Sequence, residues 1–157
     1  METSHRSTIR PASGSDLNVI LEIEQKCFSG SIAYSKRQLA YLILRANSAT
    51  FVESCEGAIR GFIILIYRQH SLIGHVETID VDPACTKSGI GLRLLKFAED
   101  DMRKRGKRWS QLEVSEGNKV ALKLYQKAGY TLKEQIKQYY KYEHEGTRDA
   151  MRMIKAL

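Results

Sequence analysis

The sequence predicts a single α+β domain built on one mixed, mostly antiparallel sheet with helices on both of its faces. The chain has 157 residues, a length that suits one domain rather than two. Its apolar residues follow two periods, one typical of strands and one typical of helices. The predicted elements run β-α-α-β-β-β-α-β-α-β-β, and the consecutive strands in the middle favour a largely antiparallel sheet. We expect the domain to span residues 1–157, with 1–7 flexible.

The first half of the chain is predicted to hold a strand, two helices and a β-hairpin, at Thr8–Pro11, Ser15–Phe28, Ser35–Ala46, Thr50–Cys55 and Ala58–Arg68. Ser15 and Asp16 are the candidate caps of the first helix. Ser35 and Gln38 form a capping box for the second. That helix carries an apolar stripe at helical spacing, made of Leu39, Leu42, Ile43 and Ala46.

The second half is predicted to hold four strands and two helices, at Gly74–Val81, Gly89–Arg105, Trp109–Ser115, Asn118–Gly129, Tyr130–Tyr140 and Ala150–Ile154. The first of these strands is irregular. Ile79 and Val81 share one face by alternation, yet the apolar Val76 falls on the other. Either a β-bulge or burial of both faces explains this pattern.

The net charge of the chain indicates which classes of partner it attracts. Lys and Arg number 25 against 18 Asp and Glu, a net charge of +7. Such a balance attracts anions, including nucleic acid and polyphosphate ligands. The densest basic cluster, Arg103–Arg108, is explained by a helix C-terminus, where cations complement the helix dipole. No nucleic-acid-binding motif accompanies it, so we expect no nucleic-acid partner.

The cysteine, histidine and hydropathy patterns argue against a metal-binding, disulfide-bonded, membrane-spanning or secreted protein. The three cysteines form no CxxC pair and the four histidines have no second ligand nearby, so we expect neither a metal nor a disulfide. No apolar stretch approaches the ~20 residues that span a bilayer. Residues 1–7 lack the apolar block of a secretory signal. We therefore expect no membrane partner and a cytoplasmic location.

The turn between strand 74–81 and helix 89–105 is a candidate anion site. Backbone N–H groups at the start of a helix, together with the helix dipole, favour a pyrophosphate there. Gly89 and Gly91 allow close approach of an anion, and Lys87 adds positive charge. The motif is neither a Walker loop nor a complete GxGxxG, and an ordinary strand-to-helix turn is the alternative.

Several motifs together resemble the GNAT N-acetyltransferase superfamily, and in particular its RimI-like branch of protein N-terminal acetyltransferases. They are Val81-Asp82-Pro83, Lys87-Ser88-Gly89-Ile90-Gly91-Leu92, Leu112-Glu113-Val114, Asn118, Ala121, Leu124-Tyr125 and Gly129-Tyr130. A tail with Tyr139-Tyr140, Asp149-Ala150 and Met153 strengthens the likeness to the RimI-like branch. The resemblance runs from about Ile9 to Ile154.

The resemblance implies that acetyl-CoA is the donor. Its pantetheine arm would lie against the backbone of Ile79, Asp80 and Val81 and contact Asn118 and Ala121. Its pyrophosphate would bind the amides of Thr86, Lys87, Ser88, Gly89, Ile90, Gly91 and Leu92. The family usually has Arg or Gln where this chain has Thr86, and Lys87 is the nearest cation that could replace it.

The implied chemistry is direct attack of a neutral amine on a thioester, which needs a base for the amine and an acid for the leaving thiolate. Glu113 and Tyr125 match the base and acid of the family. Without the resemblance, Glu113 would be a solvated strand residue and Tyr125 a core aromatic. His75 and Glu77 are rivals for the base, since His75 titrates near neutral pH and Glu77 shares its face of the strand.

The resemblance also implies an aromatic acceptor slot formed by Phe28, Tyr34, Tyr139 and Tyr140, although tyrosine is common in strands in any case. Lys133, Lys137 and Lys141 flank the last two, so we expect a slot that is not acidic. Such a slot favours a peptide or protein N-terminus, such as that of a ribosomal protein. Transfer to a small-molecule amine or a lysine side chain, and a non-catalytic CoA-sensing or basic interaction module, are the alternatives.

Overall fold

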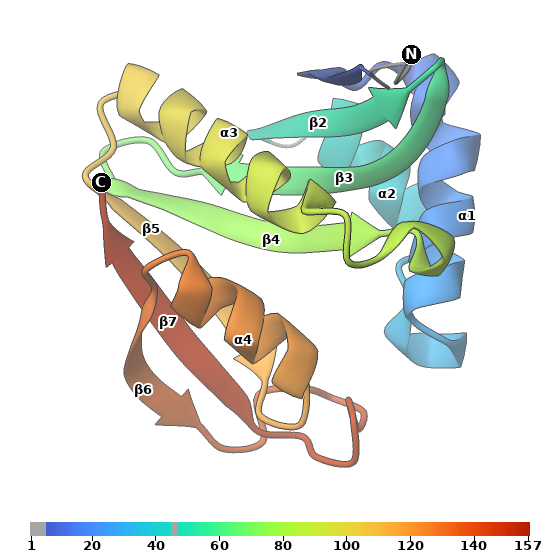
Figure 1. The fold of residues 1–157 in the computed structure, drawn as a ribbon. Coiled ribbons are helices and arrows are strands. Elements are labelled where there is room, and N and C mark those ends of the chain that lie inside the picture. The colour runs from blue at the N-terminus through green and yellow to red at the C-terminus, as the bar shows by residue number, and fades with distance from the viewer. Residues whose placement is uncertain (1–5, 45–46) are drawn as a thin grey trace.

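The computed structural model describes residues 6–44 and 47–157, in which seven strands form one sheet of order β1-β2-β3-β4-β5-β7-β6 (Figure 1). The strands are β1 (Ser7–Pro11), β2 (Ser48–Cys55), β3 (Ala58–Tyr67), β4 (Ile73–Val81), β5 (Trp109–Ser115), β6 (Thr131–Ile136) and β7 (Ala150–Ala156). The α-helices are α1 (Leu17–Cys27), α2 (Lys36–Leu44), α3 (Ile90–Lys104) and α4 (Lys119–Lys127). The predicted α+β class and order of elements are confirmed. Residues 1–5 and Ala46, on which two of the predictions fall, lie outside the described residues.

Neighbouring strands pair antiparallel except for β4 and β5, which run parallel. The parallel pairing is short, from Ile73 opposite Trp109 to Val76 opposite Leu112. Beyond Val76 the two strands separate, as Figure 1 shows. The sheet therefore has an internal opening at the C-terminal ends of β4 and β5.

Helices cover both faces of the sheet, with one apolar core under each pair. The core beneath α3 and α4 includes Leu94, Leu95, Met102, Tyr125 and Met153. The core beneath α1 and α2 includes Ile20, Ile23, Leu39, Phe62 and Ile64. Successive residues of β2 and β3 point alternately into the two cores, which is why these strands are apolar on both faces.

Strand β4 contains a β-bulge at Glu77. Ile64 of β3 lies opposite Thr78, and the next residue, Leu65, lies opposite Val76, which leaves Glu77 as the extra residue. The bulge puts Val76 and Ile79 on the same face, against the core under α3 and α4. Of the two explanations left open by the sequence, the bulge is confirmed.

Of the two predicted caps of the first helix, Asp16 is confirmed as the N-cap of α1, whereas Ser15 lies inside a 3-10 turn at Gly14–Asp16 that Ser13 caps. Two other predicted boundaries are wrong. Ser7, expected to be flexible, belongs to β1. Strand β6 ends at Ile136 instead of near Tyr140, because Gln138 adopts a positive φ of 53° that a strand cannot continue through.

Across residues 6–44 and 47–157, the helices are all too short or too polar to traverse a bilayer.

Candidate active site

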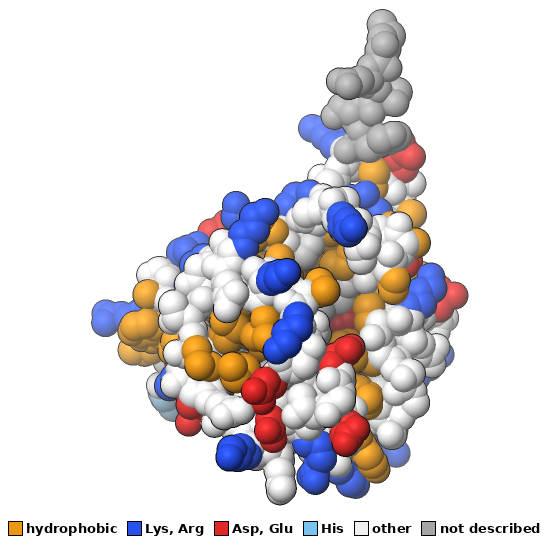
Figure 2. All heavy atoms as spheres, turned by 60° about the horizontal axis from the view of Figure 1, so that its bottom comes forward, with side chains coloured by type: hydrophobic (Ala, Val, Ile, Leu, Met, Phe, Trp, Pro, Cys, Tyr) orange, Lys and Arg blue, Asp and Glu red, His pale blue; other side chains and the backbone are white. Residues whose placement is uncertain are grey.

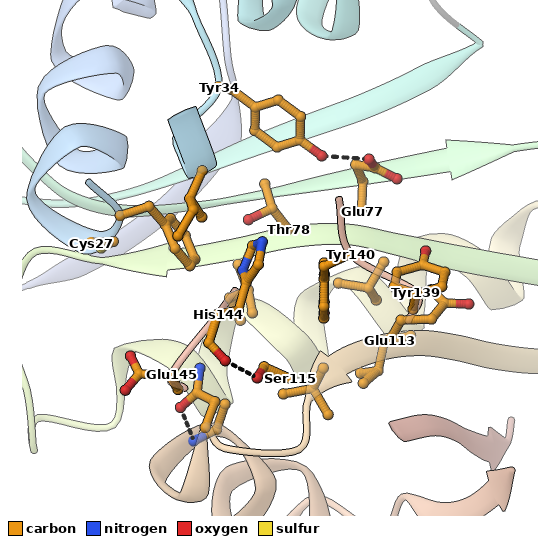
Figure 3. A pocket seen from close by; sticks show the side chains of 18 of the residues that line it. Cys27, Tyr34, Glu77, Thr78, Glu113, Ser115, Tyr139, Tyr140, His144 and Glu145 are labelled. Atoms are coloured by element: carbon orange, nitrogen blue, oxygen red, sulfur yellow. Dashed lines mark hydrogen bonds between the residues drawn. The ribbon is translucent and has the colours of Figure 1, made fainter. Parts of the chain in front are cut away.

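A cavity of about 530 Å³ occupies the opening between β4 and β5 (Figure 3). Such a volume suits a small-molecule or peptide-end ligand. Both strands line it at the point where they separate, α1 and the following loop close one side, and the loop between β6 and β7 closes the other. Beyond Val76 the β4 backbone has no partner strand on the β5 side, so its edge is available to hydrogen-bond a ligand.

The cavity brings together most of the predicted site residues. The predicted residues among its lining are Phe28, Tyr34, His75, Glu77, Ile79, Glu113, Asn118, Ala121, Tyr125, Tyr139 and Tyr140. The remaining predicted donor contacts, namely Asp80, Val81 and residues 86–92, do not line it; they lie at and beyond the end of β4, up to the start of α3.

A chain of close contacts connects the three candidates for the base. His75 Nε2 lies 2.6 Å from Glu113 Oε2, and His75 Nδ1 lies 3.4 Å from Glu77 Oε2. The Tyr34 hydroxyl donates to Glu77 Oε1 at 2.5 Å, as Figure 3 shows. The imidazole therefore stands between two carboxylates, hydrogen-bonded to Glu113 and within ion-pair distance of Glu77.

Glu113 is not the solvated residue that its strand position suggests, since its side chain is only 6% exposed. Burial favours the neutral acid, but the hydrogen bond from His75 and the guanidinium of Arg152 outweigh burial and lower the pKa of Glu113. Arg152 Nε donates to Glu113 Oε1 at 2.9 Å. Sequence reasoning missed Arg152, because its position on β7 shows no link to β5 until the strands are paired.

Tyr125, on α4, is both a core aromatic and a cavity residue. Burial, followed by the negative charge of Asp80 and the presence of Tyr140, raises the pKa of its phenol, so the hydroxyl keeps its proton at neutral pH. Within the described residues that hydroxyl makes no hydrogen bond to another side chain. A protonated, unengaged hydroxyl in a closed cavity is suited to donate to a group that gains negative charge there.

The loop between β6 and β7 supplies an aromatic wall. The rings of Tyr140 and His144 stack at 3.9 Å between centroids, and Tyr139 meets Tyr140 edge to face at 4.9 Å. Ser115 at the end of β5 holds this loop by donating to the His144 carbonyl at 2.6 Å (Figure 3). Sequence reasoning missed His144 and Ser115; the only available signal was their nearness to motif residues.

The turn before α3 has the geometry of an anion site. Lys87 and Gly89 both have positive φ, 66° and 77°, and Gly89 is the N-cap of a 15-residue helix. The first N–H groups of that helix have no intrahelical partner. Thr86 Oγ1 and Ser88 Oγ are both turned to backbone carbonyls of the same turn. Arg93, which sequence reasoning did not select, donates to the Ser88 carbonyl at 2.9 Å and adds a cation where Thr86 provides none.

Asn118 begins α4 and faces the cavity. Its side-chain oxygen accepts from the Ala121 N–H at 3.1 Å, the hydrogen bond expected of a helix cap. Its amide nitrogen makes no hydrogen bond to another described residue. Capping thus fixes the side chain and leaves a donor directed at whatever occupies the cavity.

Two buried carboxyl groups lie at the wall of the cavity, each 1% exposed: Glu24 of α1, which lines it, and Asp80 of β4, which does not. Burial and the neighbouring Glu24 raise the pKa of Asp80 well above its usual value. Glu24 Oε2 and Asp80 Oδ2 have no hydrogen-bond partner among the described residues.

Cys27 is the thiol that lines the cavity, and it is inert. Burial, and then the charges of Asp80 and Glu24, raise the pKa of the Cys27 thiol to about 12. Because the thiolate is the nucleophilic form, this residue does not serve as a covalent acyl carrier at neutral pH. The arrangement therefore favours direct transfer between two bound substrates.

The expectation of a slot that is not acidic is wrong. The lining contains Glu24, Glu77, Glu113 and Glu145 and, within the described part of the chain, no Lys or Arg. Lys133, Lys137 and Lys141 are exposed and do not line it. On the face shown in Figure 2, Lys and Arg side chains are spread over the surface, while several Asp and Glu side chains gather near its lower middle. The chain is thus positively charged overall, whereas the described side chains that line its cavity are acidic.

No group of three or more His, Cys, Asp or Glu side chains among the described residues could hold a metal ion.

Comparisons with known proteins place this geometry in context. A family model described as the acetyltransferase (GNAT) family matches residues 17–130. The chain is 30% identical over 142 residues to an uncharacterized N-acetyltransferase from Methanocaldococcus jannaschii, a match that covers 83% of this chain and 63% of that protein. It is 28% identical over 150 residues to N-alpha-acetyltransferase 30 from Schizosaccharomyces pombe, covering 94% of this chain and 96% of the yeast protein.

Among solved structures, the ribosomal-protein-S18-alanine N-acetyltransferase from Escherichia coli superposes with a TM-score of 0.84 at 26% sequence identity, covering 96% of this chain and 94% of that one. The chain thus has the length of the yeast and bacterial proteins but spans less than two thirds of the archaeal relative.

Proposed function

The chain belongs to the GNAT family of N-acetyltransferases, and on that premise we propose that it moves an acetyl group from acetyl-CoA to the α-amine of a peptide or protein N-terminus. The observation that carries the proposal is the meeting of Glu113 and Tyr125 in one aromatic-walled cavity at the opening of the sheet. Whole-length likeness to two N-terminal acetyltransferases supports the choice of amine. The acceptor of the bacterial one is a ribosomal protein, as its name states, and a ribosomal protein is a candidate here.

GNAT acetyltransferases use acetyl-CoA, and the residues of this chain fit such a donor. The free edge of β4 after the bulge, together with the Asn118 amide, would hold the pantetheine arm. The turn from Thr86 to Leu92 would hold the pyrophosphate through the N-terminus of α3, with Lys87 and Arg93 as the nearby cations. The thioester end would then lie inside the cavity, between β4 and β5.

Proton transfer is assigned to groups on the two sides of the cavity. An α-amine has a pKa near ~8 and must lose a proton before it attacks. Glu113 and His75 together take that proton, directly or through a water molecule, and Arg152 fixes the orientation of Glu113. As the tetrahedral intermediate collapses, the carbon–sulfur bond breaks and the Tyr125 hydroxyl donates a proton to the departing sulfur.

Arg152→Gln is expected to move the acidic limb of the kcat/KM–pH profile to higher pH by roughly one unit or more. The guanidinium lowers the pKa of Glu113, so its removal raises that pKa, and the base then becomes protonated at a higher pH. The control is Lys155→Gln on the same strand, because Lys155 pairs with Glu99 outside the cavity. An unshifted limb in the Arg152 variant would show that Glu113 is not the titrating group.

A second candidate function is acetylation of a small polyamine, which the acidic lining of the cavity favours. The two candidates are separated by measuring the release of CoA with a peptide that bears a free α-amine, with the same peptide blocked at that amine, and with a diamine. The proposal expects release with the free peptide and none with the blocked one. Release of CoA with the diamine alone would replace the proposed function with acetylation of a small polyamine.

A further inference from the structure

The charge inside the cavity is opposite to the charge of the chain. The protein carries +7, yet four carboxylates and no Lys or Arg are found among the described residues that line the cavity. A protein surface of this composition would, by chance, present a positive or mixed lining. The acidic lining therefore favours a cationic ligand. Its attraction is strongest at a carboxylate that lacks a cationic partner.

The four carboxylates differ in burial and in how they are compensated, and Glu145 is the one that is exposed to solvent. Glu113 is neutralised by Arg152 at 2.9 Å and contacts His75 at 2.6 Å. Glu24 is only 1% exposed, and its Oε1 accepts from the backbone N–H of Tyr34 at 3.1 Å. Glu77 has only a neutral phenol, Tyr34, at 2.5 Å and the weaker approach of His75 at 3.4 Å. Among the described residues no Lys or Arg pairs with Glu77, although its side chain is only 24% exposed.

A partly buried carboxylate without a cationic partner is costly, and a cationic ligand that reaches it removes part of that cost. The surroundings of Glu77 suit such a ligand. Tyr34 and Tyr139 stand on either side, and Tyr139 lies close enough to Glu77 for the carboxylate to help raise its phenol pKa, after burial and Glu113. Two phenol side chains beside a carboxylate that is only 24% exposed reduce its access to water, which strengthens its attraction for a cation.

The distance between Glu77 and the proposed base, Glu113, determines which part of the acceptor can carry the positive charge. The width of one imidazole, that of His75, separates the carboxylates of Glu77 and Glu113. An amine poised at Glu113 thus lies about the width of one imidazole away from Glu77. Consecutive Cα atoms of a peptide are about 3.8 Å apart, so the side chain of the second residue can cover this distance.

We infer that Glu77 is a specificity-determining residue, and that it selects acceptors which carry a second positive charge next to the amine that is acetylated. The inference rests on the proposed function, because it takes the cavity to be the acceptor site. In a peptide acceptor the second charge is a basic side chain at the second residue. In a small acceptor it is the second amine of a diamine.

The test compares acceptors that differ only in that charge. Two peptides begin Ala-Arg and Ala-citrulline, which have the same shape but differ by one positive charge, and arginine offers no second amine to acetylate. Putrescine and butylamine form the small-molecule pair. We expect kcat/KM for the charged member of the preferred pair to exceed that of the neutral member roughly tenfold or more, and the ratio to fall as salt rises.

Glu77→Gln keeps an acceptor for the Tyr34 hydroxyl and removes the charge, so we expect the ratio of charged to neutral acceptor to fall close to one. The ratio is the readout because loss of a base would lower both rates equally and leave the ratio unchanged. Glu143→Gln is the matched control, since Glu143 lies in the loop between β6 and β7 but does not line the cavity. An undiminished ratio in the Glu77 variant would overturn the inference, as would equal wild-type rates for both members of both pairs.

A binding measurement distinguishes failure of this inference from failure of the proposed function. Each peptide is titrated into wild-type protein saturated with CoA, which cannot transfer an acetyl group. Tighter binding of the Ala-Arg peptide, lost in Glu77→Gln, supports the inference even if no peptide is acetylated, in which case only the proposed function fails. Equal binding of Ala-Arg and Ala-citrulline peptides, with no preference for putrescine either, contradicts the inference whatever the enzyme acetylates.

Discussion

Tyr125→Phe is expected to lower kcat by about 10² or more, with the affinity for acetyl-CoA almost unchanged. General acid catalysis typically contributes this much, and the substitution removes only the hydroxyl that would protonate the leaving sulfur. The fold should tolerate the change. The hydroxyl makes no hydrogen bond to a described side chain, so its loss leaves no buried partner unsatisfied, and the ring keeps its edge-to-face contact with Tyr130 at 6.0 Å.

The control for this prediction is Tyr130→Phe. Its ring is equally buried in the same core, but its hydroxyl contacts Ser110 and Glu99, away from the cavity. That variant should lose stability and retain turnover at a temperature where it is folded. Single-turnover kinetics with acetyl-CoA and an N-terminal peptide gives the comparison. Full turnover in Tyr125→Phe would remove Tyr125 as the acid.

Gly89→Val is expected to abolish measurable binding of acetyl-CoA. Gly89 has φ +77°, a conformation that costs an ordinary residue roughly 1–2 kcal/mol, and a Cβ there would lie 3.1 Å from Arg93 Nη1. The turn would have to shift, and with it the N–H groups at the start of α3 that face the pyrophosphate. Isothermal titration of acetyl-CoA measures the loss.

Gly57→Val provides the matched control for that loss. Gly57 has a similar φ of +80° in the turn between β2 and β3, and a Cβ there would meet nothing within 4 Å. The two variants should lose similar stability through backbone strain, but only the Gly89 variant should lose donor binding. Normal binding by a folded Gly89→Val protein would show that the pyrophosphate does not lie at this turn.

Sequence periodicity predicted the α+β class and the order of elements, because each buried face leaves a periodic pattern of apolar residues. The hairpin of β2 and β3 and the apolar stripes of α3 and α4 needed no tertiary information, whereas the strand order and the parallel pairing of β4 with β5 did. The bulge in β4 was visible as a change of face at Val76, although the same pattern fits a strand buried on both sides. Only the register of β3 against β4 decides between them.

Much of the candidate site was predictable, from motif positions and from residue type and strand alternation at His75 and Glu77. Glu113, Asn118 and Tyr125 lie in motif positions and meet in the cavity. Arg152 and His144 lie near motif residues in the sequence, but their roles depend on how β7 and its preceding loop pack. The charge of the cavity was misjudged for the same reason: Lys137 and Lys141 neighbour the tyrosines in sequence, but the loop turns these lysines outward while Glu77 and Glu145 face the cavity.

The most direct test of the central claim is to find where the acetyl group goes. A peptide that begins Ala-Lys offers an α-amine on its first residue and an ε-amine on its second, in the same molecule. After incubation with acetyl-CoA and the enzyme, fragmentation mass spectrometry assigns the added acetyl group to one of them. Acetylation of the α-amine is the predicted result. Acetylation of the ε-amine alone would contradict the proposed function and identify the protein as an acetyltransferase of lysine side chains.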